Sequence, residues 1–234
     1  MKDPQNSPGA VKKLLRAGLK QAGFTKIQSL RQVHRARVVT TGRGKLENMA
    51  QPPPEADGLV GREKGVLGLV TVADCVPVFL LDPISLAWGL VHAGWRGVAE
   101  HILAESLRVL EESFGISAER LEIYLGPAIC GSCYEVGPEV VNRLEKLGAG
   151  EKNALSQGKT FLDLRSLLAR DAQNRGVPSE NIYISSYCTR CHNELFYSYR
   201  GQGDSALGCM WAFFGNGPGG MMGAANKAYH PQSA

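Results

Sequence analysis

The stretch of sequence that decides the fold is residues 70–98, VTVADCVPVFLLDPISLAWGLVHAGWRGV. The apolar runs Val66–Val72 and Trp88–His92 have the length and composition of buried strands. The first run is followed at once by Asp74 and Cys75, and the second closes on a histidine. Strands that open into polar loops place side chains at the mouth of a sheet, where small-molecule sites tend to lie. We therefore expect the chemistry of this protein at these strand ends.

Outside this stretch, strand and helix patterns are intermixed. The turn at residues 93–97 leads into an amphipathic helix over Val98–Phe114, which Gly115 ends. Consecutive strands near the carboxyl end favour a mixed sheet, so we predict a mixed α/β (α+β) fold. The other expected elements are strands over Arg37–Thr40, Leu121–Leu125, Ile182–Ser186, Leu195–Tyr199 and Met210–Phe214, and helices over Pro138–Leu147 and Leu162–Ala172.

A chain of 234 residues is long enough to form one domain with a full hydrophobic core. We place this domain at residues 1–214 and assign residues 1–30 to an amino-terminal helical segment, in which the pattern after Ser7 predicts a helix that ends at Gly23. The last twenty residues, 215–234, are rich in glycine. We expect them to form a flexible tail.

Composition narrows the classes of function. The net charge of +4 comes from 26 basic and 22 acidic residues spread along the chain, which does not predict nucleic-acid binding. The sequence has no signal-peptide pattern and no apolar run near the ~20 residues that span a bilayer, so we expect a cytoplasmic protein without membrane contact. Thiols stay reduced in the cytoplasm. The six cysteines are therefore expected to be free, metal-bound or catalytic.

His34, Cys75 and His92 each stand at a strand boundary. Two imidazoles and one thiolate suit zinc, and three protein ligands would leave one position open for water or substrate. Their separations along the chain match no local zinc signature. A buried free cysteine with two hydrogen-bonded histidines therefore remains an alternative.

Four motifs follow one another along the chain: TVADCVPVFLLD (71–82), HAGWRGV (92–98), GPAICGSCYEVGPEV (126–140) and CTRCHNELFYSYR (188–200). Together they resemble the laccase-domain family, over about Gln32 to Phe214. That family was long labelled multicopper polyphenol oxidase and is now understood as purine nucleoside phosphorylases with broader nucleoside activity. The resemblance implies a single-domain sandwich of mixed β-sheet with flanking helices.

The resemblance also implies one metal, usually zinc with copper as an alternative, held by His34, Cys75 and His92. These are the residues that the strand ends already indicate. Asp74 would lie beside the metal as a catalytic residue that orients a ligand or transfers a proton. Hydrogen bonding at the strand end is the structural alternative for Asp74.

The activity implied by the resemblance is phosphorolysis of adenosine, inosine and guanosine, cleavage of methylthioadenosine, and adenosine deamination. The partners would be a purine nucleoside and phosphate, with the protein a monomer or homodimer. Arg96 and Arg200 are candidates to bind phosphate, with Arg96 also catalytic, because a guanidinium fork matches phosphate oxygens. Tyr134 is a candidate to stack a base. Salt bridges for the arginines and core packing for the tyrosine are the structural alternatives.

Departures from the family pattern concern the substrate and not the ligand set. The chain begins with a helical pattern where the family usually carries an extra strand segment. Arg35 stands where glycine normally follows the QVH motif, and Cys209 stands where an arginine is common. These changes would remove a substrate contact or change specificity.

Two other functions use the same residues. A multicopper oxidase needs more histidines than the five in this chain, but a single copper site with His34, His92 and Cys75 would make an electron carrier. A metal-free hydrolase or deamidase would use Cys75 as nucleophile and His92 as base.

The remaining cysteines form two C-x2-C pairs, Cys130/Cys133 and Cys188/Cys191. The pairs are much farther apart in the sequence than the ~15–20 residues of zinc ribbons. We therefore expect free thiols, with a second, structural zinc site as the alternative.

Overall fold

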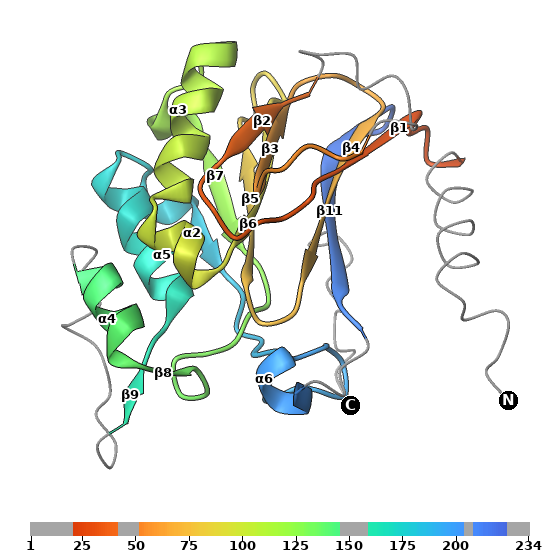
Figure 1. Cartoon of the computed structure of the whole chain (residues 1–234). Coiled ribbons are helices and arrows are strands. Elements are labelled where there is room, and N and C mark those ends of the chain that lie inside the picture. The colour runs from red at the N-terminus through yellow and green to blue at the C-terminus, as the bar shows by residue number, and fades with distance from the viewer. Residues whose placement is uncertain (1–20, 42–51, 146–158, 204–207, 224–234) are drawn as a thin grey trace, which may run out of the picture.

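The structure is a computed structural model that describes residues 21–41, 52–145, 159–203 and 208–223. These residues form two facing β-sheets, and helices cover the outer face of the larger sheet (Figure 1). Both sheets mix parallel and antiparallel pairs, so the mixed α/β prediction is confirmed. No helix in the described ranges is long and apolar enough to cross a membrane.

The larger sheet has the strand order β10 (Ile182–Ile184), β7 (Glu122–Leu125), β5 (Val76–Leu81), β6 (Trp88–Ala93), β3 (Gly58–Gly61), β2 (Val38–Thr40). The smaller sheet has the order β1 (Lys26–Ser29), β4 (Val66–Val72), β11 (Met210–Gly217), β12 (Gly220–Gly223). A short pair, β8 (Glu135–Val136) and β9 (Thr160–Phe161), stands apart.

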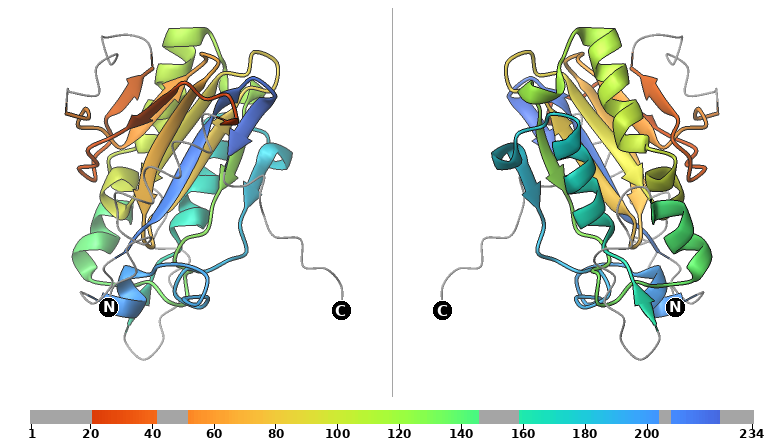
Figure 2. Two further views of the ribbon diagram at one scale, coloured as in Figure 1. Left: turned by 90° about the vertical axis from the view of Figure 1, so that its right-hand side faces the viewer. Right: turned by 90° about the vertical axis from the view of Figure 1, so that its left-hand side faces the viewer.

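The longer described helices lie on one side of the molecule. In the view from the helical side (Figure 2, right), α3 (Ile102–Phe114) and α5 (Leu164–Asn174) lie side by side over the larger sheet. Three shorter helices stand nearer the end of the sheets at which β4 leads into β5 (Figure 1): α2 (Trp95–Ala99), α4 (Pro138–Leu144) and α6 (Tyr199–Gln202).

The core forms on both faces of the larger sheet. Val78 and Leu80 of β5 belong to the cluster that includes the helices, whereas Phe79 belongs to the cluster between the two sheets. Trp88 is completely buried in the second cluster. Each large apolar side chain buried in this way stabilises the fold by about 1.5–3 kcal/mol. Burial on both faces explains why the central strands read as continuous apolar runs.

The expected strands at residues 66–72 and 88–92 are confirmed as β4 and β6. The structure adds β5, which the sequence pattern does not separate from the motif before it. Six further expected elements have counterparts in the structure whose ends differ from the prediction. They are the strands Arg37–Thr40, Leu121–Leu125, Ile182–Ser186 and Met210–Phe214, and the helices Pro138–Leu147 and Leu162–Ala172.

Two helix predictions need correction. The expected helix Val98–Phe114 is two helices, because His101 adopts a left-handed conformation (φ 63°) between α2 and α3. The segment 1–30 is not helical throughout, since residues 26–29 form β1 and pair with β4. The helix expected after Ser7 lies largely outside the described residues.

The predicted strand Leu195–Tyr199 is wrong. Residues 191–195 form turns, residue 196 is a bend, and α6 begins at Tyr199. The Ser198 side chain accepts a hydrogen bond from the Gly201 N–H at 3.0 Å, which is the N-cap interaction that favours a helix start over an extended strand.

The predicted flexible tail is also wrong for residues 215–223. These residues complete β11 and form β12, joined in an antiparallel hairpin. A Cβ at residue 215 would lie 2.2 Å from the carbonyl oxygen of Val66, so this glycine allows close contact between β11 and β4. Residues 224–234 lie outside the described ranges.

Candidate metal centre

The structure brings His34, Cys75 and His92 together. Their ligand atoms all lie within 4.8 Å of one another. The two imidazole rings meet edge to face with centroids 4.7 Å apart. His34 is exposed, whereas His92 is buried at 3% exposure, so the cluster has one accessible side.

Cys75 reaches the centre because the chain changes sheets beside it. Strand β4 of the smaller sheet leads through Ala73, Asp74 and Cys75 into β5 of the larger sheet, at the lower end of both sheets in Figure 1. Asp74 adopts φ 85° at this bend, a conformation that only a well-supported turn maintains. Strand β5 pairs antiparallel with β6 so that Pro77 faces His92. The register therefore places Cys75 beside the end of β6.

Asp57 holds both histidines, and sequence reasoning missed it. Its carboxylate is fully buried and accepts hydrogen bonds from the backbone N–H groups of Val33 (3.1 Å), His34 (3.0 Å) and Arg35 (2.9 Å). These bonds support the left-handed conformation of His34 (φ 57°). The same carboxylate lies 2.8 Å from Nδ1 of His92. The only sequence signal for Asp57 is its position just before β3.

Gln32 fastens the His34 loop to the smaller sheet. Its amide donates to the carbonyl oxygen of Thr71 at 2.8 Å and accepts from the Thr71 backbone N–H at 2.7 Å. The loop is therefore held on one side by β4 and on the other by Asp57. This arrangement fixes His34 even though its side chain is exposed.

The ionisation of the centre follows from these contacts. Burial opposes charge on Asp57, but the hydrogen bond from His92 and the backbone N–H groups outweigh it and lower its pKa. Burial also opposes charge on His92, yet hydrogen bonds to Asp57 and Cys75 raise its pKa to about 9. Burial of Cys75 is likewise outweighed by hydrogen bonds with His34 and His92, which lower its pKa to about 7. These shifts favour a Cys75 thiolate beside a protonated His92 imidazolium.

Gly94 lies directly against the cluster. A Cβ at this position would stand 3.0 Å from Sγ of Cys75 and 3.3 Å from the ring of His34. Both neighbours are held by their own contacts, so neither can easily move away. The glycine of the HAGWRG motif therefore leaves the space that the three side chains need.

Asp74 has both carboxylate oxygens engaged. Oδ1 accepts from the Thr189 hydroxyl at 2.6 Å, and Oδ2 accepts from the Arg200 backbone N–H at 2.7 Å. This is the hydrogen-bonding role given above as the structural alternative. A catalytic role for Asp74 stays a prediction.

The other expected substrate residues gather around Tyr134. The Arg200 guanidinium lies 5.1 Å from the Tyr134 ring and donates to the carbonyl oxygen of Glu135 at 2.8 Å. Burial, and next the charge of Cys75, raise the pKa of Tyr134 to about 12, against the opposing charges of Arg200 and Arg96. Tyr134 is only 8% exposed and belongs to the core cluster that includes the helices, so little of its ring surface is free to stack on a base.

Arg96 is exposed on α2, where its guanidinium stacks 4.4 Å from the Trp95 ring. Arg200 belongs to α6 and not to a strand end as predicted. The two arginines that were candidates for phosphate thus lie within separate motifs, Arg96 in residues 92–98 and Arg200 in residues 188–200, and the positive charge of each acts on Tyr134.

The two C-x2-C pairs, which the sequence spacing separates, meet in the structure. The sulfur atoms of Cys130, Cys133, Cys188 and Cys191 all lie within 4.8 Å of one another. None of the six cysteines forms a disulfide.

The fold and the motifs define a class. The sequence profile of the family described as multi-copper polyphenol oxidoreductase laccase matches residues 3–216, and the chain belongs to this family.

Relatives within the family carry more specific names. The protein called purine nucleoside phosphorylase YlmD from Geobacillus stearothermophilus is 35% identical over 192 residues, which cover 79% of this chain and 70% of that protein. Adenosine deaminase RL5, from an unknown prokaryotic organism, is 36% identical over 150 residues, 62% of this chain and 56% of that protein. The crystal structure of YlmD from Geobacillus stearothermophilus has a TM-score of 0.77 at 31% identity, covering 87% of this chain and 78% of that chain.

Proposed function

We propose that the protein is a zinc-dependent purine nucleoside phosphorylase that also deaminates adenosine. Its substrates would be adenosine, inosine, guanosine and methylthioadenosine, with phosphate as the second substrate. The names of the relatives support the reaction class. The observation that carries the proposal is the cluster of His34, Cys75 and His92 around the buried Asp57.

The donor set fits zinc. Thiolate and imidazole are preferred zinc ligands, and three of them are typical of a catalytic site that keeps its fourth position open. The Asp57 carboxylate fixes Nδ1 of His92 as the protonated nitrogen and leaves Nε2 to act as a ligand. When bound, zinc would supply a water molecule that ionises near neutral pH, as deamination requires.

Phosphorolysis needs a site for the phosphate dianion. An oxygen of hydrogen phosphate bonds to the anomeric carbon while the glycosidic C–N bond breaks, and the proton that the phosphate loses ends on the leaving purine. Arg96 and Arg200 would hold the phosphate by charge-assisted hydrogen bonds. Arg200 suits this role because its backbone N–H is bonded to Asp74 and its guanidinium to the Glu135 carbonyl oxygen. These contacts limit the motion of its side chain before phosphate binds.

A metal-free cysteine hydrolase or deamidase is the second candidate. The observation in its favour is the pKa of Cys75, lowered to about 7 beside two imidazoles, as in an activated nucleophile. The same contacts serve a metal ligand equally well. Activity that survives complete metal removal would favour this candidate.

The test is product analysis by chromatography. Purified protein is incubated with adenosine, with and without phosphate, before and after metal removal and zinc replacement. Adenine that forms only with phosphate and only in the zinc-replete protein supports the proposal, and inosine in either tube supports deamination. Adenosine left intact by zinc-replete protein contradicts it. A blue colour on copper loading would favour an electron carrier instead.

A further inference from the structure

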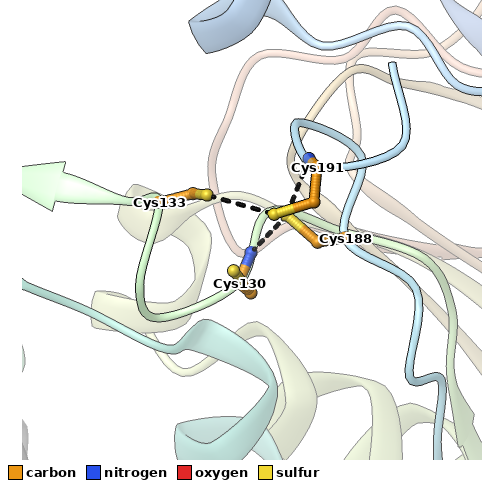
Figure 3. A group of neighbouring side chains, drawn as sticks. All are labelled: Cys130, Cys133, Cys188 and Cys191. Carbon is orange, nitrogen blue, oxygen red and sulfur yellow. Dashed lines mark hydrogen bonds between the residues drawn. The ribbon is translucent and has the colours of Figure 1, made fainter. Parts of the chain in front are cut away.

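The four-cysteine cluster has the geometry of a metal site. Sγ of Cys133 lies 3.4 Å from Sγ of Cys191, and all four sulfur atoms fall within 4.8 Å of one another (Figure 3). Four sulfurs at about 2.3 Å from one zinc ion stand about 3.8 Å apart at the corners of a tetrahedron. The cluster therefore has the size of a single-ion site with four protein ligands.

Each C-x2-C pair is a tight turn that points both sulfurs to the same side. The Tyr134 N–H donates to the Cys130 carbonyl oxygen at 3.0 Å, and the His192 N–H donates to the Cys188 carbonyl oxygen at 3.0 Å. Sγ of Cys188 accepts from the backbone N–H groups of Cys130 (3.3 Å) and Cys191 (3.4 Å), one from each turn (Figure 3). Donors aimed at a sulfur stabilise negative charge there, as a thiolate ligand requires.

The parallel pairing of β7 and β10 explains why distant cysteines meet. Ile182 pairs with Ile123 in parallel strands, so the loops that follow the two strands leave from the same end of the sheet. A further bridge joins Ala128 to Cys188. Each loop carries one C-x2-C turn, and the fold brings the two turns together.

We propose that Cys130, Cys133, Cys188 and Cys191 bind a structural zinc ion. Four protein ligands leave no open position, in contrast to the three-ligand centre. Disulfides explain the arrangement less well, because an S–S bond is about 2.0 Å long and each sulfur could pair only once. This proposal does not depend on the nucleoside activity proposed above.

The zinc would fasten two loops that carry residues of the candidate active site. Thr189, which bonds to Asp74, lies between Cys188 and Cys191, and Tyr134 follows Cys133. Arg190 adds a bond from its guanidinium to the Cys133 carbonyl oxygen at 3.0 Å. Because the metal ties together loops far apart in the chain, its binding free energy would contribute directly to folding.

The test counts zinc in variants that separate the two sites. Metal content per chain is measured by mass spectrometry in Cys75→Ala, which removes a ligand of the three-ligand centre and leaves the four-cysteine cluster intact. We expect one tightly held zinc per chain in this variant and none after Cys133→Ala and Cys191→Ala are added. Cys209→Ala, at an exposed cysteine outside both sites, should keep the wild-type zinc content. Less than 0.2 zinc per chain in Cys75→Ala, on the order of trace contamination, would overturn the proposal.

Cobalt gives a second readout that does not require the variants of the four-cysteine cluster to fold. Cobalt-loaded Cys75→Ala should show strong sulfur-to-metal charge transfer and the visible bands of tetrahedral thiolate coordination. Two disulfides, detected as the absence of titratable thiols at these four positions in freshly purified protein, would contradict the proposal. Stoichiometric iron in place of zinc would also contradict the proposal. Iron is the other metal to test for, because it too binds in a tetrahedral four-sulfur site.

Discussion

The three-ligand centre and the four-cysteine cluster are built in different ways. His34 and Cys75 lie in two separate loops between strands, His92 lies on β6, and the buried Asp57 holds both histidines in place. The four cysteines come from two local turns whose backbone N–H groups point at one sulfur. The folded sheets hold the three-ligand centre, which has an accessible side. The four-cysteine cluster supplies all four ligands of a tetrahedral site and leaves no open position. Long-range packing assembles both clusters, but it brings together single side chains in the first and whole two-cysteine turns in the second. This difference fits the chemical role proposed for the first and the loop-stabilising role proposed for the second.

The largest expected effect is on activity, from Cys75→Ala. Loss of a ligand should lower kcat/KM for adenosine phosphorolysis by at least about 10³-fold, because several kcal/mol of transition-state stabilisation are lost. The melting temperature should change less than in variants of the four-cysteine cluster. Chromatographic kinetics and calorimetry measure the two quantities, and Cys209→Ala is the matched control. If variants of the four-cysteine cluster lost as much activity as Cys75→Ala, the proposed difference in role between the two clusters would be wrong.

The next effect should be on stability, from Cys133→Ser combined with Cys191→Ser. Loss of the bound ion should lower the melting temperature by about 10 °C, because the metal contributes to folding. Activity of the remaining folded protein should fall less than in Cys75→Ala. An unchanged melting temperature would mean that the cluster does not bind a structural metal.

Asp57→Asn sharpens the comparison at the three-ligand centre. The carboxylate that orients His92 is lost, so zinc affinity there should fall by about 10- to 100-fold in competition with a chelator. Asp82→Asn is the matched control. Asp82 is also fully buried, its carboxylate lies 2.6 Å from the Arg120 guanidinium, and it belongs to neither cluster. Both variants should lose stability, but only Asp57→Asn should lose zinc. Equal zinc affinity in the two variants would refute the orienting role of Asp57.

Arg200→Lys tests the phosphate site. Lysine keeps the charge but loses the guanidinium fork, so KM for phosphate should rise about tenfold while KM for adenosine changes little. Arg108→Lys on α3 provides the control at a distant exposed arginine. If the KM for phosphate stayed the same in Arg200→Lys, Arg200 would have only a structural role.

The smallest effect concerns the ion pair between Asp82 and Arg120, which lies outside both candidate metal sites. Burial of Asp82 opposes its ionisation, but hydrogen bonds from Ser85 and Ile84 and the charge of Arg120 outweigh it and lower its pKa below 3.8. Since the folded-state pKa is the lower one, the stabilisation is present above pH 3.8 and is lost as the pH falls through the folded-state value. Asp82→Asn should flatten the loss of stability below about pH 5, by about 1 kcal/mol in urea unfolding. An acid profile identical to wild type would assign the stabilisation to other carboxylates.

The sequence predicts the elements that carry strong periodicity and misses those defined by pairing. The apolar runs that form β4 and β6 are visible because both faces of each strand are largely buried. The glycines from residue 215 look like a tail, because the need for close contact with β4 is a property of the folded sheet and not of the segment.

The same division applies to the sites. His34, Cys75 and His92 stand out because reactive side chains end apolar runs, but Asp57 precedes a strand in an ordinary way and only its buried contacts reveal it. The spacing typical of zinc ribbons argues against one site for the two cysteine pairs, because it assumes that a short loop connects the pairs. The parallel pairing of β7 and β10 supplies the proximity instead. Two predicted strands that are each followed by C-x2-C within about five residues are the signal that could have found the cluster.

The most direct test of two separate centres is a zinc titration of metal-depleted protein. Melting temperature and adenosine phosphorolysis are followed in the same samples. Four thiolate ligands should bind zinc more tightly than the open centre, so the first equivalent should restore stability and the second should restore activity. Recovery of both properties with a single equivalent would contradict the account.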